Sequence, residues 1–188
     1  MRKTLLITLI AVLSALFSGC GNNEKASAPE KDSKQIDQVQ GADQQKSDGK
    51  EAFENYLNSI TPILQEIGTW GQKYEDLRTK SANGQISNEE FAAAISNELL
   101  PEGNKLQEKM ESIMPEEKEF RDVQEKLNQM MAKNNQAFSE IIAAINAGDA
   151  SKITSVNNLL SEARELERQA YYDLKDLSDK YGVPFMNQ

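Results

Sequence analysis

The amino-acid sequence predicts an all-α protein whose main part is an antiparallel up-and-down four-helix bundle with kinked first and second helices. From residue 50 onward, apolar residues recur at alternating spacings of three and four, the period of a helix face packed against other helices. The period-two alternation typical of strands is almost absent. Glycine, proline and capping residues divide the region into four segments with short connections, which favour antiparallel neighbours.

The chain opens with the pattern of a processed export signal. Arg2 and Lys3 give a cationic start, and Leu5 to Phe17 form a run of 13 apolar or hydroxyl residues. A helix of that length rises about 20 Å, too little for a hydrocarbon core of about 30 Å. We therefore expect residues 1–19 to be a signal peptide that is removed, not a permanent membrane span.

The only cysteine, Cys20, ends this run. The residues before it that a signal peptidase would recognise are Leu16, Phe17, Ser18 and Gly19. This segment resembles the lipobox of bacterial lipoproteins, although Phe17 stands where an aliphatic residue is usual. The resemblance implies that Cys20 carries diacylglycerol and becomes the first residue of the mature chain. The alternatives are a secretory signal with a chance cysteine, or an uncleaved anchor.

Residues 20–49 differ in composition from the rest of the chain. They hold just two large aliphatic residues, Ile36 and Val39, too few to offset the entropy of ordering the segment. We expect a lipidated cysteine followed by a disordered linker that spans roughly 30 Å and tethers the helical domain of residues 50–188. A short induced helix over residues 33–45, or a partner-binding peptide, is the alternative.

The first helical segment begins at Lys50 and is interrupted by a proline. Pro62 should kink the helix or remove one backbone hydrogen bond, and Asn83 with Gly84 supplies a stop. The residues expected to face the core are Phe53, Leu57, Ile60, Leu64, Ile67, Gly71 and Tyr74.

The second segment covers residues 88–113. Ser87 and Glu90 have the spacing of a capping box, and Pro101 with Gly103 predicts a break or bend near residues 100–103. The expected core residues are Phe91, Ile95, Leu99, Leu106, Met110 and Ile113.

The third and fourth segments are separated by Gly148, which ends one helix, and Asp149, which can cap the next. Pro115 suits the first turn of the third helix. In the fourth, Leu166 covers an interruption at Glu167, and residues 182–184 end the helix. The expected core residues are Phe120, Val123, Leu127, Met130, Asn134, Ala137, Ile141 and Ala144, then Ile153, Val156, Leu160, Ala163, Ala170, Leu174, Leu177 and Tyr181.

The charge balance limits the classes of partner. Loss of residues 1–19 removes two basic residues and no acidic one, so the net charge of −9 becomes −11 in the mature chain. Nucleic acid is therefore excluded as a partner, and membrane attachment should come from acyl chains. With Cys20 lipidated, no cysteine remains for a disulfide.

No side chain is assigned a catalytic, cofactor or metal role. Histidine is absent, which removes the usual general base and the commonest transition-metal ligand. The candidate carboxylates alternate with the basic residues Lys109, Arg164 and Arg168. We therefore expect a solvated helix face rather than a calcium or magnesium site. Those carboxylates are Glu108 with Glu111, and Glu162 with Glu165.

The aromatic residues suggest a platform for sugar rings of cell-wall polymer, but filling of the core edges is expected instead. Trp70 is one position from Gly71 in the seam, so we expect it at a flank of the bundle. Asn134 should fix the register between helices. Met114, Met130 and Met131 are interpreted as adaptable packing. The aromatic residues in question are Tyr56, Trp70, Tyr74, Tyr171, Tyr172 and Tyr181.

The region from Met114 to Tyr181 resembles the helical hairpin of small, uncharacterised lipoproteins of Bacillus and related Gram-positive bacteria. The resemblance rests on Pro115 and on residues 145–149 and 156–163. It implies a lipid-anchored domain on the outer face of the cytoplasmic membrane, and it transfers no active site.

These observations predict a non-enzymatic interaction or scaffold module at the cell envelope. It would be held to the membrane by covalent diacylglycerol on Cys20, and it would face an envelope protein or cell-wall partner. The alternative is a binding module with a small apolar or metal ligand in a cavity near residues 101–103, and an enzyme ranks third.

Overall fold

A computed structural model describes the backbone of residues 39–185 and the side chains of residues 49–185, and every regular element in it is helical. The all-α class is confirmed for this part of the chain. None of the described helices is long and apolar enough to cross a membrane. The elements are α1 (Val39–Ala82), α2 (Asn88–Ala94), a π-helical turn (Ile95–Leu99), α3 (Leu100–Glu111), α4 (Lys118–Ala147), a 3-10 turn (Ala150–Lys152) and α5 (Ile153–Tyr181).

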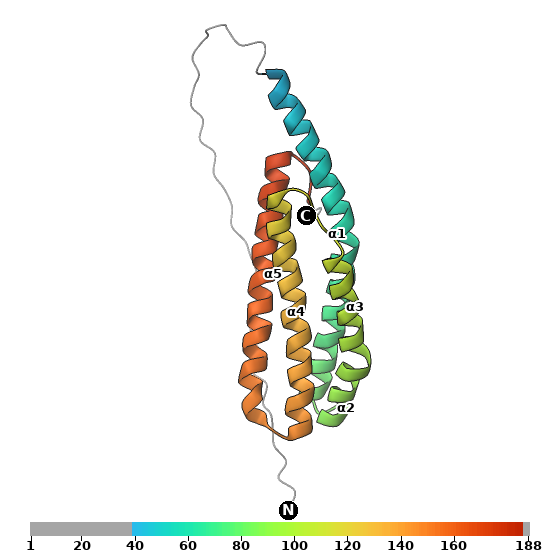
Figure 1. Cartoon of the computed structure of the whole chain (residues 1–188). Helices are drawn as coiled ribbons and strands as arrows, with labels where there is room; N and C mark the ends of the chain where they lie inside the picture. The colour runs from blue at the N-terminus through green and yellow to red at the C-terminus, as the bar shows by residue number, and fades with distance from the viewer. Residues whose placement is uncertain (1–38, 186–188) are drawn as a thin grey trace, which may run out of the picture.

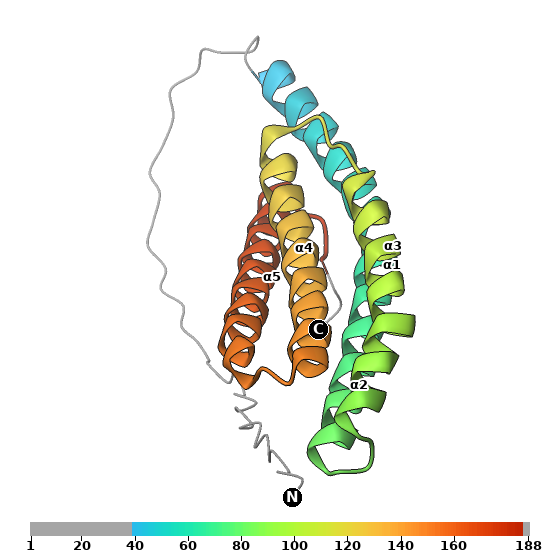
Figure 2. The ribbon, with the colours of Figure 1, turned by 60° about the horizontal axis from the view of Figure 1, so that its bottom comes forward.

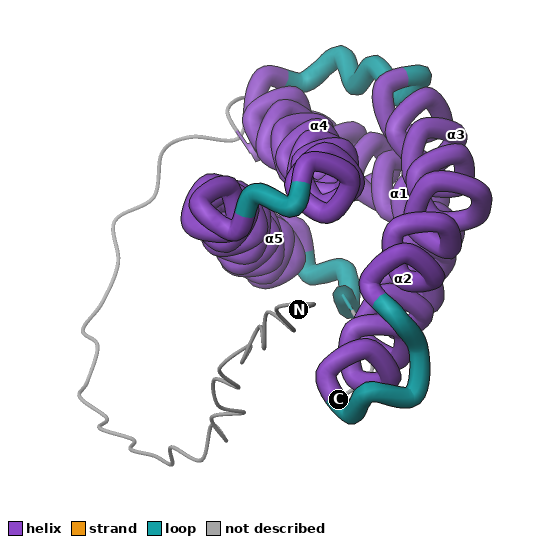
Figure 3. The backbone as a smooth tube through the Cα atoms, turned by 90° about the horizontal axis from the view of Figure 1, so that it is seen from below, coloured by secondary structure: helices purple, strands orange, loops and turns teal. Residues whose placement is uncertain are grey.

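The helices form two groups around a shared interior. α4 and α5 lie side by side and meet at a short turn, while α1 lies along α2 and α3 (Figures 1 and 2). The α1–α2 turn and the α4–α5 turn are at the same end of the molecule, as the view along the helices shows (Figure 3). The start of α1 extends past the opposite end (Figure 1).

Helix α1 begins earlier than the sequence predicts. It starts at Val39, so the last part of the expected linker is helical, and it continues through Pro62 to its end before Gly84, whose φ is 68°. The side chain of Pro62 is on the exposed face. A proline there costs a backbone hydrogen bond but no core contact.

The core face of α1 is shifted by one position in two places. Ile63 and Trp70 are buried, whereas Leu64 and Gly71 are half-buried. The predicted alternation of threes and fours follows a period of 3.5, but a helix turns every 3.6 residues, so the buried face drifts along a long helix. Placing Gly71 at the core was therefore wrong, whereas Leu64 packs against the core as a partly buried side chain.

The second segment begins as predicted and stays helical through Pro101. The backbone nitrogen of Glu90 donates to Ser87 Oγ (3.1 Å), and the nitrogen of Ser87 donates to Glu90 Oε2 (2.7 Å), which confirms the capping box. Just before Pro101, the Leu100 N–H bonds the Ile95 carbonyl five residues back. Such a π-helical turn is wider than an α-turn and accommodates the ring and the missing N–H of a proline.

The ends of α4 and α5 agree with those that the sequence predicts, except at Pro115 before α4. Gly148 and Gly182 end the two helices in the left-handed conformation, with φ of 62° and 65°. Asp149 accepts a hydrogen bond from the nitrogen of Ser151 at 3.0 Å, so its capping role is confirmed. Because α4 begins at Lys118, Pro115 lies in the connection before it, and its predicted place in the first turn was wrong.

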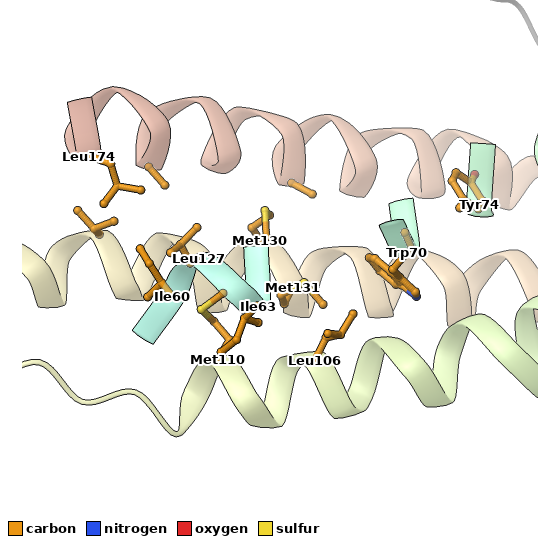
Figure 4. Close-up of a cluster of buried hydrophobic side chains, with 14 of the residues drawn as sticks. Ile60, Ile63, Trp70, Tyr74, Leu106, Met110, Leu127, Met130, Met131 and Leu174 are labelled. Carbon is orange, nitrogen blue, oxygen red and sulfur yellow. The ribbon is translucent and has the colours of Figure 1, made fainter. Parts of the chain in front are cut away.

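The core runs the length of the helices and is rich in aromatic rings. The ring centroids of Tyr56 and Phe120 are 5.4 Å apart and stacked, and those of Trp70 and Phe138 are 4.9 Å apart. Leu127, Met130 and Met131 of α4 are buried between the other helices (Figure 4), which confirms the predicted face of this helix around them. Such burial is the main stabilising contribution for a helical domain without disulfides.

Candidate functional site

The predicted lipidation site lies outside the described residues. This applies to Cys20 and to the peptidase-recognition residues Leu16, Phe17, Ser18 and Gly19. The structure therefore bears only on the sites expected in the helical domain.

The candidate carboxylates are dispersed over exposed surface. Glu108, Glu111, Glu162 and Glu165 are all exposed, and Glu162 pairs with Lys133 at 2.6 Å. Hydrogen bonds from Gln169 and then Arg168 lower the pKa of Glu165 below its ordinary value. No group of three or more metal-binding side chains occurs among residues 49–185. All four glutamates therefore lie on solvent-exposed helix surface.

The aromatic residues do not gather into one platform. Tyr56, Trp70 and Tyr74 are buried, whereas Tyr171 and Tyr172 are 46% and 54% exposed on α5. The flank position expected for Trp70 was wrong, since this side chain is 2% exposed. Its Nε1 donates a hydrogen bond to the Leu99 carbonyl at 2.8 Å.

The packing role predicted for Met114 was also wrong. It is 86% exposed in the connection between α3 and α4, whereas Met130 and Met131 are in the core as expected. The connection holds no regular structure between Ile113 and Pro115, so nothing directs the Met114 side chain inward.

Beside Pro101 and Gly103, where the sequence predicts a ligand cavity, the structure packs two side chains against Gly103. A Cβ atom on Gly103 would lie 2.7 Å from Trp70 Cζ2 and still closer to Asn135 Oδ1. At distances below 3.0 Å a neighbouring group must shift to make room for a Cβ. The glycine therefore permits close approach of α3 to Trp70 and Asn135.

Of the two neighbouring asparagines of α4, Asn135 is buried and Asn134 is not. Asn135 is 6% exposed and its Nδ2 donates to Gln107 Oε1 at 2.9 Å, whereas Asn134 is half-buried. Asn135 Oδ1 is buried without a hydrogen-bond partner in the described structure. The core-facing role expected of Asn134 therefore belongs to its neighbour.

A second buried polar residue was missed by the sequence. Gln124 is 4% exposed; its Nε2 donates to the Met110 carbonyl at 2.6 Å, and its Oε1 accepts from the Tyr56 hydroxyl at 3.1 Å. Burial raises the pKa of Tyr56, so its hydroxyl stays a donor. Gln124 thus joins α1, α3 and α4 through hydrogen bonds, which is a structural role.

One cavity lies at the end of the molecule that holds the α1–α2 turn. Its volume is about 510 Å³, and it is lined by this turn and by residues of α1, α2, α4 and α5. Most of its walls are apolar side chains, with a few polar groups. Its lining includes Tyr74, Arg78, Phe91, Ile141, Ile145 and Val156.

The polar side of this cavity holds serine and asparagine side chains and one cation, Arg78, which is paired with Glu75. Arg78 is the only charged residue that lines it, in a chain of net charge −9. Arg78 Nε and Nη2 donate to Glu75 Oε2 at 2.9 and 2.6 Å, on the outer side of α1. Burial raises the pKa of Tyr74 to about 12; Glu75 adds to the rise, and Arg78 and Arg164 oppose it.

The sequence holds only a weak signal for this site. Arg78 follows Tyr74 by four residues and so lies on the core side of α1, where a charged residue is unusual. The other lining residues come from four helices, and their meeting at one end depends on how the helices pack.

Comparison with known families, curated proteins and solved structures finds no match to this chain.

Proposed function

We propose that this protein is a lipid-anchored, extracytoplasmic helical module that presents an interaction surface at the cell envelope. The observation that carries the proposal is the export signal ending at a single cysteine, in the pattern of a lipobox. Lipid on Cys20 would hold the chain at the cell membrane, facing outside the cytoplasm. No catalytic role is included in the proposal.

The helical domain is proposed to be an antiparallel up-and-down bundle, kinked at Pro62 and at the π-helical turn. Support comes from the short turns after α1 and α4 at one end and the α3–α4 connection at the other (Figure 1). Proline and π-helical turns are the usual causes of kinks in helices. Such a bundle is a rigid body that can hold a binding surface away from the membrane.

An exposed aromatic pair offers a contact surface for an envelope protein or cell-wall partner. The rings of Tyr171 and Tyr172 are 5.8 Å apart, and Phe185 lies 5.9 Å from Tyr171. Exposed tyrosines are enriched at protein interfaces because they combine apolar area with a hydroxyl. The negative net charge favours a partner with a basic or neutral surface.

The lipid anchor is tested by metabolic labelling with radioactive palmitate. The wild-type chain should be labelled and sediment with membranes, whereas Cys20→Ser should carry no label. Ser14→Ala, inside the signal run, is the matched control and should be labelled as wild type. Label that persists on Cys20→Ser, or an intact leader on cytosolic protein by mass spectrometry, would refute the anchor.

The interaction surface is tested by photo-crosslinking in cells. A photoreactive phenylalanine analogue at position 172 should give a discrete adduct, while the same analogue at the exposed position of Gln65 on α1 should not. Equal adducts at both positions, or none at position 172, would argue against the aromatic pair as the contact.

A further inference from the structure

We propose that the cavity beside the α1–α2 turn binds a long-chain carboxylate, with its head at Arg78 and its apolar chain between the helices. This site goes beyond the proposed envelope role and does not depend on lipid at Cys20. It is also separate from the position near Pro101.

The cavity has the size and walls of a small-molecule site. Its volume of about 510 Å³ lies within the range of roughly 300 to 1,000 Å³ that ligand pockets occupy. Phe91, Ile141, Ile145 and Val156 contribute apolar walls from α2, α4 and α5. An alkyl chain would cover these side chains and remove apolar surface from water.

Arg78 supplies the charge that selects an anionic head. Its two contacts with Glu75 use Nε and Nη2, and Nη1 makes no hydrogen bond to the residues described here. A guanidinium has five N–H donors, so it can bind a ligand carboxylate while it keeps its contact with Glu75. No aspartate or glutamate lines the cavity, and the carboxylate nearest to the proposed head site is Glu75, on the other edge of the guanidinium.

Tyr74 supplies a second polar contact. The side chain is 9% exposed and lines the cavity, yet its hydroxyl has no hydrogen-bond partner within residues 49–185. Because its pKa is raised to about 12, the hydroxyl is protonated at neutral pH and can donate to a carboxylate. A bound carboxylate head would give this hydroxyl an acceptor at the wall of the cavity.

Binding is tested on the full chain with cis-parinaric acid, a fluorescent long-chain carboxylate. Trp70, the only tryptophan, is one helical turn from Tyr74, and both rings lie against Phe138 at 4.9 and 4.7 Å. Saturable energy transfer from Trp70 to the probe is expected, with displacement by palmitate and much weaker displacement by hexadecanol. Absence of saturable transfer overturns the site; equal displacement by hexadecanol overturns the anionic preference.

Matched variants separate the cavity from nonspecific binding. Arg78→Gln should weaken probe binding about tenfold, the loss expected for a charged hydrogen bond. Arg168→Gln breaks a similar pair, with Glu165 three residues before it, but lies outside the cavity, and should bind as wild type. Equal effects of the two variants would refute the role of Arg78.

The apolar walls are tested in the same way. Ile145→Phe should fill part of the cavity and weaken binding, whereas Ile142→Phe, at a half-buried position of α4 that does not line it, should not. Circular dichroism on both variants verifies that the helices are intact. Unchanged binding by a folded Ile145→Phe would overturn the proposed position of the chain.

Discussion

The indole nitrogen of Trp70 donates a hydrogen bond to the backbone carbonyl of Leu99 at 2.8 Å. The bond joins α1 to the π-helical turn between α2 and α3, and both side chains are almost fully buried. A buried indole N–H needs an acceptor, and here a backbone carbonyl in the irregular turn provides it. The irregularity before Pro101 is thus part of the core contact between helices.

Trp70→Phe should destabilise the protein by about 2 to 4 kcal/mol. The substitution removes the hydrogen bond to Leu99 and leaves unfilled volume next to Phe138. Urea unfolding followed by circular dichroism measures the change. Tyr172→Phe, on the exposed face of α5, should change stability by less than about 0.5 kcal/mol. A loss for Trp70→Phe as small as for this control would contradict the burial of the indole.

Two glycines that look alike in the sequence should respond in opposite directions to alanine. Gly103→Ala should cost about 1 to 3 kcal/mol or more, because its Cβ would meet Trp70 and Asn135. Gly68→Ala should stabilise by about 0.5 to 1 kcal/mol, since that position in α1 is exposed and has nothing within 4 Å.

A double variant tests the cause of the Gly103 effect. Asn135→Ala removes the oxygen nearest to the new Cβ but leaves the contact with Trp70. The loss caused by Gly103→Ala should therefore be smaller in the Asn135→Ala background, and a thermodynamic cycle from urea unfolding measures the coupling. Additive losses of stability would show that the new Cβ atom at position 103 does not contact the side chain of Asn135.

The apolar period was sufficient to predict the helices and most of their core faces. It identified Phe120, Val123 and Leu127 as core residues of α4 because spacing alone determines which side of a regular helix is apolar. It missed Trp70 and Asn135, each one position from a predicted core residue. Over a helix as long as α1 or α4, a small error in period moves the buried face by one residue.

The cavity could not be predicted from spacing. Its walls come from α1, α2, α4 and α5, so it depends on the separation of helices at one end of the molecule. The sequence instead pointed to Pro101 and Gly103, where a helix-breaking pair suggested open space. In the structure the small glycine is covered by a large side chain, because the missing Cβ lets Trp70 approach.

Leu127→Ala should lower the free energy of unfolding by about 2 to 5 kcal/mol. Leu127 is 3% exposed on α4, so truncation creates a cavity among tightly packed side chains. Leu160→Ala, at a half-buried position of α5 that the sequence placed in the core, should cost clearly less. A loss below about 0.5 kcal/mol for Leu127→Ala would mean that this residue faces water.

Alkaline pH should destabilise the fold through Tyr74. Burial, reinforced by Glu75, raises its pKa from 10.0 to about 12, so between these values the unfolded chain loses the proton while the folded chain keeps it. The stabilising contribution is complete below pH 10 and is lost as pH rises toward 12, by roughly 3 kcal/mol. Burial raises the pKa of Tyr56 too, which acts in the same direction.

Tyr74→Phe isolates this contribution. Urea unfolding at about pH 8 and about pH 11.5 should show a smaller alkaline loss in the variant than in the wild type, because phenylalanine has no proton to release. Tyr172→Phe is the matched control, since Tyr172 is 54% exposed, and it should keep the full loss. If Tyr74→Phe and Tyr172→Phe lost equal stability over this range, ionisation of Tyr74 would not be coupled to folding, and its hydroxyl would be as accessible to water in the folded chain as in the unfolded one.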